Sequence, residues 1–303
     1  MQLHPHYSQN PLSDDIYYMT IPLNVGKAPG VNGVFLVDTG GLHITTALDI
    51  GTPDTSSIPR QHMYASGSVM GYPTVGTCRF STRTYLQDVA ITHKIHNWNI
   101  AEGIDGILGL LPAEGSVASK LESIGLDFQN WQLSFNQANC HPDSHNSPRI
   151  VQTPLQHPAP PLSSNALWIR GSLALLGPHA RDGGAPVVKR FKDIWMFLDT
   201  GSTLAMTFVE KGSKFSMVKA PNCSTDLGIH TLRLENAGDN KATMELDMPH
   251  NISWPSCIPS TEAVDIDFVV LGIQILSKLA YLHYTIDKGR ISSVCIGQPP
   301  SLL

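Results

Sequence analysis

Two aspartates stand out as residues able to do chemistry. Asp38 follows the apolar run Phe35–Val37, and Asp199 follows the apolar run Met196–Leu198. Each run has the length and composition of a buried strand, and the Thr-Gly after each aspartate suits a tight turn. One Asp-Thr-Gly would be weak evidence, because Asp and Gly are common in turns. Two copies predict a pair of carboxylates, each held at the end of a buried strand.

A second pair of motifs makes these copies part of an internal repeat. An apolar run that ends in glycine follows each aspartate, at Gly106–Gly109 in the first half and at Val269–Gly272 in the second. In each half, about 70 residues separate the aspartate from that final glycine. The repeat predicts two similar lobes related by a pseudo-two-fold axis, which would bring Asp38 and Asp199 face to face. Carboxylates paired in this way are suited to general acid–base chemistry.

The composition predicts the kind of element that positions them. The 303 residues fit two domains of about 150 residues each. With 25 Gly, 22 Pro and only 15% charged residues, the chain favours many short strands over long amphipathic helices. A polar, Pro-containing run at 140–148 predicts a boundary between lobes 1–148 and 149–303. A competing alignment places the boundary near Asp182–Gly184.

Individual segments carry further expectations. Residues 1–15 are polar and predict a loose arm, and a strand should begin at Ile16. The stretch Leu121–Gly125 predicts a short helix that its glycine ends. Trp131–Phe135 alternates between apolar and polar residues, as a strand does.

Taken together, these motifs resemble those of the pepsin-type aspartic peptidases over nearly the whole chain. Tyr17–Ile21 resembles the first strand of that family, Tyr64–Gly71 its flap hairpin, and Leu279–Gly297 its closing strands. The resemblance implies an all-β, bilobal fold in which two β-barrel-like lobes flank a central cleft.

The resemblance also implies a role for each residue around the aspartates. Asp38 and Asp199 would share one proton and activate a water molecule for attack on a peptide bond. Thr39 and Thr200 would lock the two turns together, and the amides of Gly40 and Gly201 would reach the carboxylates. Ser202 would supply a hydroxyl donor. On the flap, Tyr64 would close over the substrate and Gly67 would bend the hairpin, with Tyr72 as a nearby rival to Tyr64.

Two positions depart from the family pattern, and both lie on the side of the first aspartate. Gly41 stands where the family has a Ser or Thr that donates to the aspartate, and this loss should raise the lower pKa of the pair. Thr45 stands where the family has a tryptophan that holds the flap tyrosine. These departures predict an altered pH dependence, weaker peptidase activity or a different reaction on the same fold.

Five cysteines give an odd count. By resemblance, Cys223 and Cys257 form a disulfide in the second lobe, with unpaired core cysteines as the alternative. Cys78, Cys140 and Cys295 have no evident partners and are expected to be small buried hydrophobic residues.

Several classes of function are disfavoured. The net charge of −5 carries no basic patch, so we expect no nucleic-acid partner. No apolar run reaches about 18 residues, so we expect no membrane span. The 13 histidines show no metal-ligand spacing and no glycine-rich loop precedes a helix, so we expect no metal, cofactor or nucleotide. The N-terminal residues show no signal peptide; the protein is secreted if the sequence is a trimmed mature chain and cytoplasmic if Met1 is the natural start.

We therefore predict a monomeric acid endopeptidase that cleaves peptide or protein substrates at mildly acidic pH. The first alternative is an enzyme of the same fold that uses both aspartates for acid–base work on a small molecule, such as a cyclisation or an isomerisation. The second alternative is a non-catalytic binding module.

Overall fold

The computed structural model describes residues 1–7, 16–51, 58–64, 67–81, 84–96, 102–137, 149–152, 165–177, 187–203, 206–210, 231–236, 242–247 and 266–299. In this part of the chain nearly all regular structure is β. Helical structure is limited to a 3₁₀ turn, η1 (Ala118–Lys120), and one short helix, α1 (Ile273–Leu276). None of the helices in these ranges is long and apolar enough to cross a membrane.

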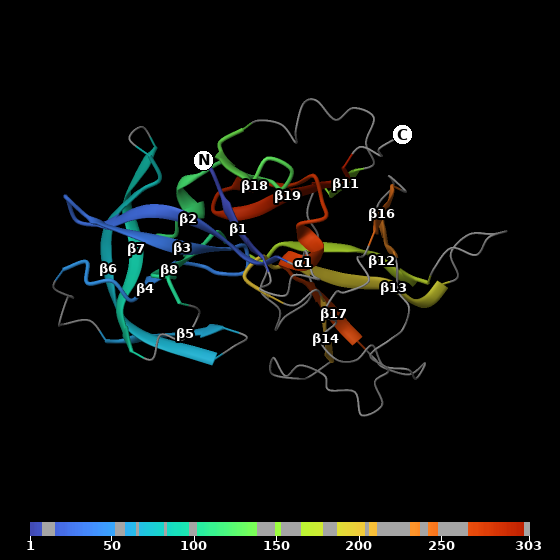
Figure 1. Ribbon diagram of the computed structural model, residues 1–303, viewed down its shortest axis with the longest axis horizontal. Helices are drawn as coiled ribbons and strands as arrows, with labels where there is room; N and C mark the ends of the chain where they lie inside the picture. The colour runs from blue at the N-terminus through green and yellow to red at the C-terminus, as the bar shows by residue number, and fades with distance from the viewer. Residues whose placement is uncertain are drawn as a thin grey trace.

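The strands form three sheets (Figure 1). Their bounds are β1 (His4–Tyr7), β2 (Ile16–Gly26), β3 (Val31–Asp38), β4 (Ile44–Thr46), β5 (Arg60–Tyr64), β6 (Gly67–Arg79), β7 (Tyr85–His96), β8 (Gly106–Gly109), β9 (Ser123–Asp127), β10 (Gln132–Phe135), β11 (Arg149–Gln152), β12 (Trp168–Leu176), β13 (Val187–Leu198), β14 (Met206–Glu210), β15 (Thr231–Asn236), β16 (Thr243–Asp247), β17 (Ile266–Leu271), β18 (Tyr281–Asp287) and β19 (Arg290–Gly297).

The first lobe is built on an eight-stranded sheet in the order β1-β2-β3-β8-β4-β7-β6-β5. Strands β3 and β8 pair in parallel, with Leu36 opposite Ile107 and Asp38 opposite Gly109. Phe35, Val37 and Leu108 are fully buried, as expected for apolar strands in the middle of a sheet. The end of β3 therefore delivers Asp38 beside the glycine that ends β8.

The second lobe repeats this arrangement in a six-stranded sheet with the order β14-β17-β13-β12-β15-β16. Strands β13 and β17 also pair in parallel, and Leu198 lies opposite Leu271. The two apolar-plus-glycine motifs thus occupy matching places beside the two Asp-Thr-Gly turns. This equivalence is the structural form of the internal repeat.

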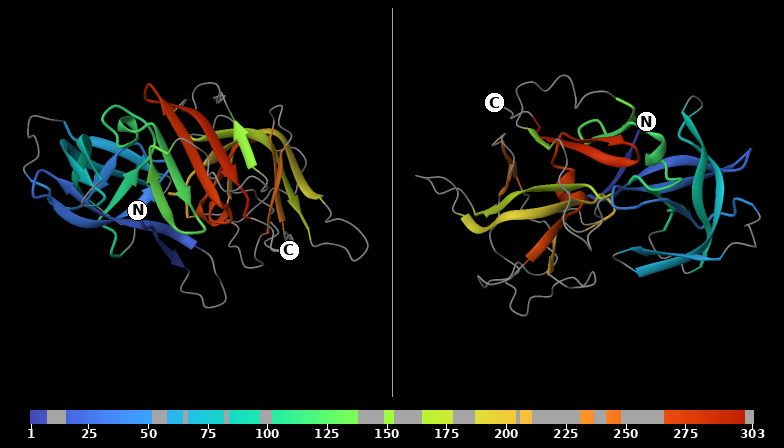
Figure 2. Two further views of the ribbon diagram at one scale, coloured as in Figure 1. Left: turned by 90° about the horizontal axis from the view of Figure 1, so that it is seen from above. Right: turned by 180° about the vertical axis from the view of Figure 1, so that it is seen from behind.

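A third sheet joins the lobes. Its order is β10-β9-β18-β19-β11, so strands from the first half of the chain pair with strands from its C-terminal end. Figures 1 and 2 show β18 and β19 between the two lobes. We call β9, β10, β11, β18 and β19 the interlobe sheet. The predicted all-β, bilobal fold is confirmed.

One hydrophobic core runs through all three sheets. It joins Val37 and Leu108 of the first lobe, Leu198 and Leu271 of the second, and Leu282 of the interlobe sheet. The lobes are therefore packed as one body through shared apolar contacts.

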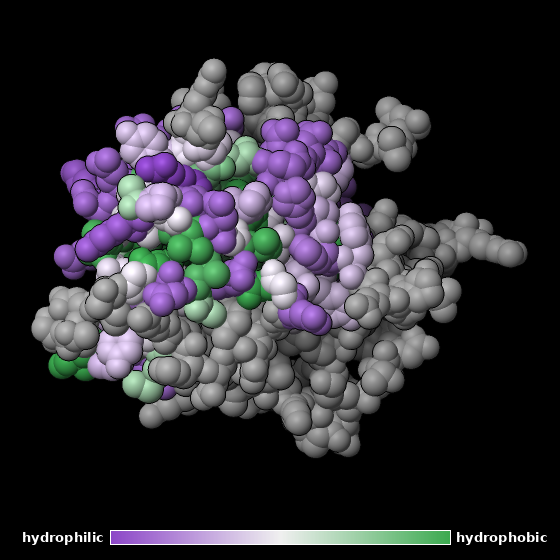
Figure 3. Space-filling view, turned by 60° about the vertical axis from the view of Figure 1, so that its left-hand side comes forward, coloured by the Kyte–Doolittle hydropathy of each residue, from purple (hydrophilic) through white to green (hydrophobic). Residues whose placement is uncertain are grey.

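On the face seen in Figure 3, hydrophilic residues surround a smaller apolar area.

Two sequence-based expectations were wrong. Residues 1–7 are not a loose arm: β1 pairs with β2, Leu3 is 1% exposed, and Met1 exchanges hydrogen bonds with the backbone of Leu133. Leu121–Gly125 is not a helix, because the helical turn ends at Lys120 and Ser123 already begins β9. In both places pairing with a distant strand overrides the local pattern.

The cysteines are only partly covered by the described residues. Cys78 is a free thiol within the first lobe, and burial raises its pKa. Cys295 is buried in the interlobe sheet, but it is disulfide-bonded, so the expectation that it is an unpaired hydrophobic residue was wrong. The predicted Cys223–Cys257 disulfide lies outside the described residues, as does Cys140.

Leu282 tests the contribution of the interlobe sheet to stability. Leu282 is fully buried, so Leu282→Ala should lower the free energy of unfolding by about 2–5 kcal/mol. Val75 on β6 is 56% exposed, and Val75→Ala should change it by no more than about 0.5 kcal/mol. Urea denaturation of both variants measures the difference. Equal losses in the free energy of unfolding would show that burial of Leu282 in the interlobe sheet adds no particular stability.

Candidate active site

The two Asp-Thr-Gly turns meet at the junction of the lobes. Asp38 is the last residue of β3, and Asp199 directly follows β13. The backbone N–H of Leu110 donates to the Asp38 carbonyl (2.9 Å), and the N–H of Asp199 donates to the Leu271 carbonyl (3.0 Å). Each aspartate is therefore fixed by the strand that runs parallel to its own.

The threonines of the two turns bond to each other reciprocally. The N–H of Thr39 donates to Thr200 Oγ1 (3.0 Å), and the N–H of Thr200 donates to Thr39 Oγ1 (2.9 Å). The Thr39 hydroxyl donates to the Leu198 carbonyl and the Thr200 hydroxyl to the Val37 carbonyl, each at 2.9 Å. Both threonines are fully buried, so these four bonds are not exchanged with water.

The glycines bring the carboxyl groups together. The N–H of Gly40 donates to Asp38 Oδ1 (2.7 Å), and the N–H of Gly201 donates to Asp199 Oδ1 (2.9 Å). A Cβ on Gly40 would lie 2.6 Å from Asp199 Oδ1, and one on Gly201 would collide with the Asp38 carboxyl group. Only glycine leaves room here for each carboxyl group to reach across to the opposite turn. The two carboxyl groups therefore face each other, close enough for the charge of Asp199 to affect the pKa of Asp38.

Burial raises the pKa of both carboxyl groups. The Asp38 pKa is raised well above its usual range, and the charge of Asp199 raises it further, against opposing amides at Gly40 and Gly41. Burial also raises the Asp199 pKa, but its interactions with Asp38 and with the amides of Gly201, Ser202 and Gly40 oppose this rise. The pKa of Asp38 is thus the more strongly raised of the two, which favours the neutral form of Asp38.

Gly41 does more than remove a hydroxyl donor. A Cβ at this position would lie 2.7 Å from Asp38 Oδ2 and 3.2 Å from the Cα of Gly109. The Gly41 N–H donates to the backbone carbonyl of Asp38 (3.4 Å), so the backbone of Gly41 is held against this residue. The N–H of Ser202, its counterpart in the second lobe, donates to the Asp199 carbonyl in the same way (3.2 Å).

The flap motif forms a hairpin. Strands β5 and β6 pair antiparallel, with Tyr64 opposite Gly67 next to the tip. The tip residues 65 and 66 and the side chain of Tyr64 lie outside the described residues. Tyr72 lies further along β6, opposite His93. Thr45 is fully buried on β4, between its partners Ile107 and Thr92.

Sequence reasoning missed a small apolar cluster beside Asp38. Leu36 precedes Asp38 by two residues, so the two side chains share a face of β3. Leu36 packs with Ile104, Ile107 and the partly buried Tyr18 in a cluster separate from the main core. The alternation along β3, with Phe35 and Val37 on the opposite face, is the signal that could have revealed it.

The described residues contain no group of three or more His, Cys, Asp or Glu side chains that could hold a metal ion.

Comparison with known proteins supports the fold. No protein-family model and no curated protein sequence matches the chain. Among solved structures, the chain is similar to the aspartic proteinase from Irpex lacteus, with a TM-score of 0.60 and 17% sequence identity, over 93% of this chain and 94% of that one. The fold is thus that of an aspartic proteinase.

The raised pKa of Asp38 predicts how stability depends on pH. Its contribution is complete below the unfolded-state pKa of 3.8 and is lost as the pH rises through the higher folded-state pKa. Asp38→Asn cannot ionise at this position. As the pH rises from about 4 to about 7, the wild type should therefore lose free energy of unfolding relative to Asp38→Asn. Chemical denaturation across this range measures the gain. Asp287→Asn, which alters an exposed carboxylate at the end of β18, should run parallel to the wild type, and a parallel course for Asp38→Asn would contradict the assignment.

Proposed function

We propose that the protein is an aspartic-type acid endopeptidase. The observation that carries the proposal is the facing pair of carboxyl groups of Asp38, which is buried, and Asp199, which is partly buried. Each is held in a turn that the opposite lobe locks in place, so a single chain supplies both members of the pair. The fold of an aspartic proteinase agrees with this function.

The asymmetry of the pair gives each carboxyl group a role. The Asp199 carboxylate removes a proton from a water molecule, whose oxygen attacks the carbonyl carbon of the scissile peptide bond. Asp38 donates its proton to the carbonyl oxygen, which gives a neutral tetrahedral diol. As the C–N bond breaks, Asp199 returns its proton to the leaving nitrogen, and Asp38 takes one back from a diol hydroxyl as the new carboxyl product forms. The two aspartates thereby regain their starting states.

The surroundings of the pair favour an extended peptide as substrate. The cluster of Leu36, Ile104, Ile107 and Tyr18 lies on the Asp38 face of β3, and Tyr18 is its partly exposed member. A large apolar side chain next to the scissile bond would bury area against Tyr18 and gain about 25 cal/mol per Å². The β5–β6 hairpin would cover the bound peptide as a flap and exclude water.

Gly41 and Thr45 favour one alternative. Both are smaller than the residues expected there in a pepsin-type peptidase, and both lie on the Asp38 side of the site. An enzyme that uses the same pair for acid–base work on a small molecule would need neither a tight flap contact nor an extended cleft. Such an enzyme would lose activity on substitution of either aspartate but would cleave no peptide.

Cleavage of an unfolded protein between about pH 3 and about pH 7, with and without pepstatin, tests the proposal. We expect cleavage that pepstatin inhibits and that is fastest at mildly acidic pH, where the buried pair still holds its shared proton. Asp38→Asn and Asp199→Asn should each lower kcat by about 10²–10⁴-fold, because each removes a proton-transfer group.

Asp287→Asn serves as the matched control and should cleave like the wild type. A folded wild-type protein that is silent at every pH would overturn the peptidase function and leave the small-molecule enzyme as the reading to test. Maximal cleavage at about pH 2 would contradict the expected retention of the proton to milder pH.

A further inference from the structure

The backbone of each aspartate turn is held by an equivalent peptide group. In the first lobe the N–H of Leu111 donates to the Gly41 carbonyl, and in the second the N–H of Ile273 donates to the Ser202 carbonyl, both at 2.9 Å. The carbonyls of these same peptide groups belong to Leu110 and Gly272. The pseudo-symmetry thus extends from the aspartates to the peptide groups behind them.

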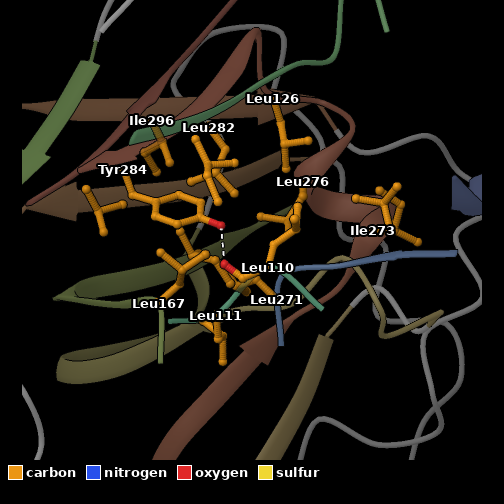
Figure 4. Packing of buried hydrophobic residues seen from close by; sticks show 14 of the residues in the cluster. Leu110, Leu111, Leu126, Leu167, Leu271, Ile273, Leu276, Leu282, Tyr284 and Ile296 are labelled. Carbon is orange, nitrogen blue, oxygen red and sulfur yellow. Dashed lines mark hydrogen bonds between the residues drawn. The ribbon is translucent and has the colours of Figure 1, made fainter. Parts of the chain in front are cut away.

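The two lobes satisfy these carbonyls in different ways. The Gly272 carbonyl accepts from the N–H groups of Ile275 and Leu276, each at 3.0 Å, in the first turn of α1. Residues 111–113 form no helix in the first lobe. Instead, the Leu110 carbonyl accepts a hydrogen bond from the hydroxyl of Tyr284 at 2.6 Å (Figure 4).

Tyr284 comes from the interlobe sheet. It lies on β18, is completely buried, and points in Figure 4 toward Leu110 among leucines of both lobes, such as Leu111 of the first and Leu271 of the second. Burial, followed by the negative charge of Asp38, raises the pKa of the Tyr284 hydroxyl well above its usual range. The hydroxyl is therefore neutral at any working pH and remains a donor.

We propose that Tyr284 is a positioning residue for Asp38, acting through the Leu110–Leu111 peptide group and Gly41. This inference rests on the proposed function, since Asp38 is the acid of that mechanism. The Tyr284 hydroxyl fixes and polarises the peptide group whose N–H holds the Gly41 carbonyl. Gly41 has no side chain to limit its backbone, so this contact keeps the Gly41 backbone against Asp38. There the Gly41 N–H donates to the Asp38 carbonyl (3.4 Å), and a Cβ on Gly41 would lie 2.7 Å from Asp38 Oδ2.

In the first lobe, the donor to the carbonyl behind the aspartate turn therefore comes from the interlobe sheet. In the second lobe, the donors come from the lobe's own helix, α1. The acid of the pair is tied to the C-terminal hairpin β18–β19, whereas Asp199 is held within its own lobe. A change in the packing of that hairpin should affect the position of Asp38 more than that of Asp199.

Tyr284→Phe removes the hydroxyl and leaves the ring in place. We expect kcat to fall about fivefold to tenfold while KM changes less than about twofold, because one hydrogen bond is lost behind the acid and none at the substrate. The acidic limb of the pH profile should move, since the Gly41 amide no longer opposes protonation of Asp38 as well. Exchange of the Leu111 amide hydrogen, followed by mass spectrometry, should become about tenfold faster.

Tyr281→Phe is the matched control. Tyr281 lies on the same strand and is 4% exposed, but it lies three residues before Tyr284 and so on the opposite face of β18. There it packs with Cys295 and Ala280, and its hydroxyl lies 3.9 Å from Cys295 Sγ. It should leave kcat, the pH profile and Leu111 exchange as in the wild type. Equal effects of the two variants on all three measurements would overturn the proposal, as would wild-type behaviour of Tyr284→Phe.

The exchange measurement separates this inference from the proposed function, because it needs no substrate. If Leu111 exchange rises in Tyr284→Phe alone while the wild type cleaves no peptide, Tyr284 positions the Asp38 turn and the peptidase function fails. If the wild type cleaves peptides but Leu111 exchange does not respond, the peptidase function stands and the role of Tyr284 is refuted.

Discussion

The reciprocal hydrogen bonds between Thr39 and Thr200 are the constraint on which the rest of the site depends. Each threonine uses both its amide and its hydroxyl across the junction of the lobes, and both residues are fully buried. A buried polar group that lost its partner would pay its full desolvation cost, so the two turns are stable only when they are together. The same contact brings two carboxyl groups into one site, where the ionisation of one disfavours that of the other.

The threonine hydrogen bonds are symmetric, but the two carboxyl groups are not equivalent. One backbone amide donates to each carboxyl group, from Gly40 to Asp38 and from Gly201 to Asp199, but Asp38 is buried whereas Asp199 is only partly buried. Gly41 adds the close approach of its backbone to Asp38, which leaves no space for a Cβ. The environments of the two carboxyl groups therefore differ through burial and through a glycine that has no counterpart in the second turn.

The sequence could predict the features that repeat or that depend on neighbouring residues. The two Asp-Thr-Gly turns and the hairpin around Gly67 follow from local patterns, and the pairing of the lobes follows from the repeat. The docking of Leu3, the strand that begins at Ser123 and the bond from Tyr284 to Leu110 depend on partners far along the chain. No local pattern carries that information, because the side chain or strand that decides the structure comes from another sheet.

The interlobe sheet explains why both ends of the chain are needed for the site. Strand β9 of the first half pairs with β18 of the C-terminal end, and β11 pairs with β19. The turn that carries Asp38 is thus supported from behind by residues that follow it by more than half of the chain, through Tyr284. A lobe folded alone would keep its own sheet but would lack both the opposite threonine and, in the first lobe, the donor to Leu110. The geometry of the acid is therefore a property of the assembled molecule, even though the tripeptide that supplies it is local.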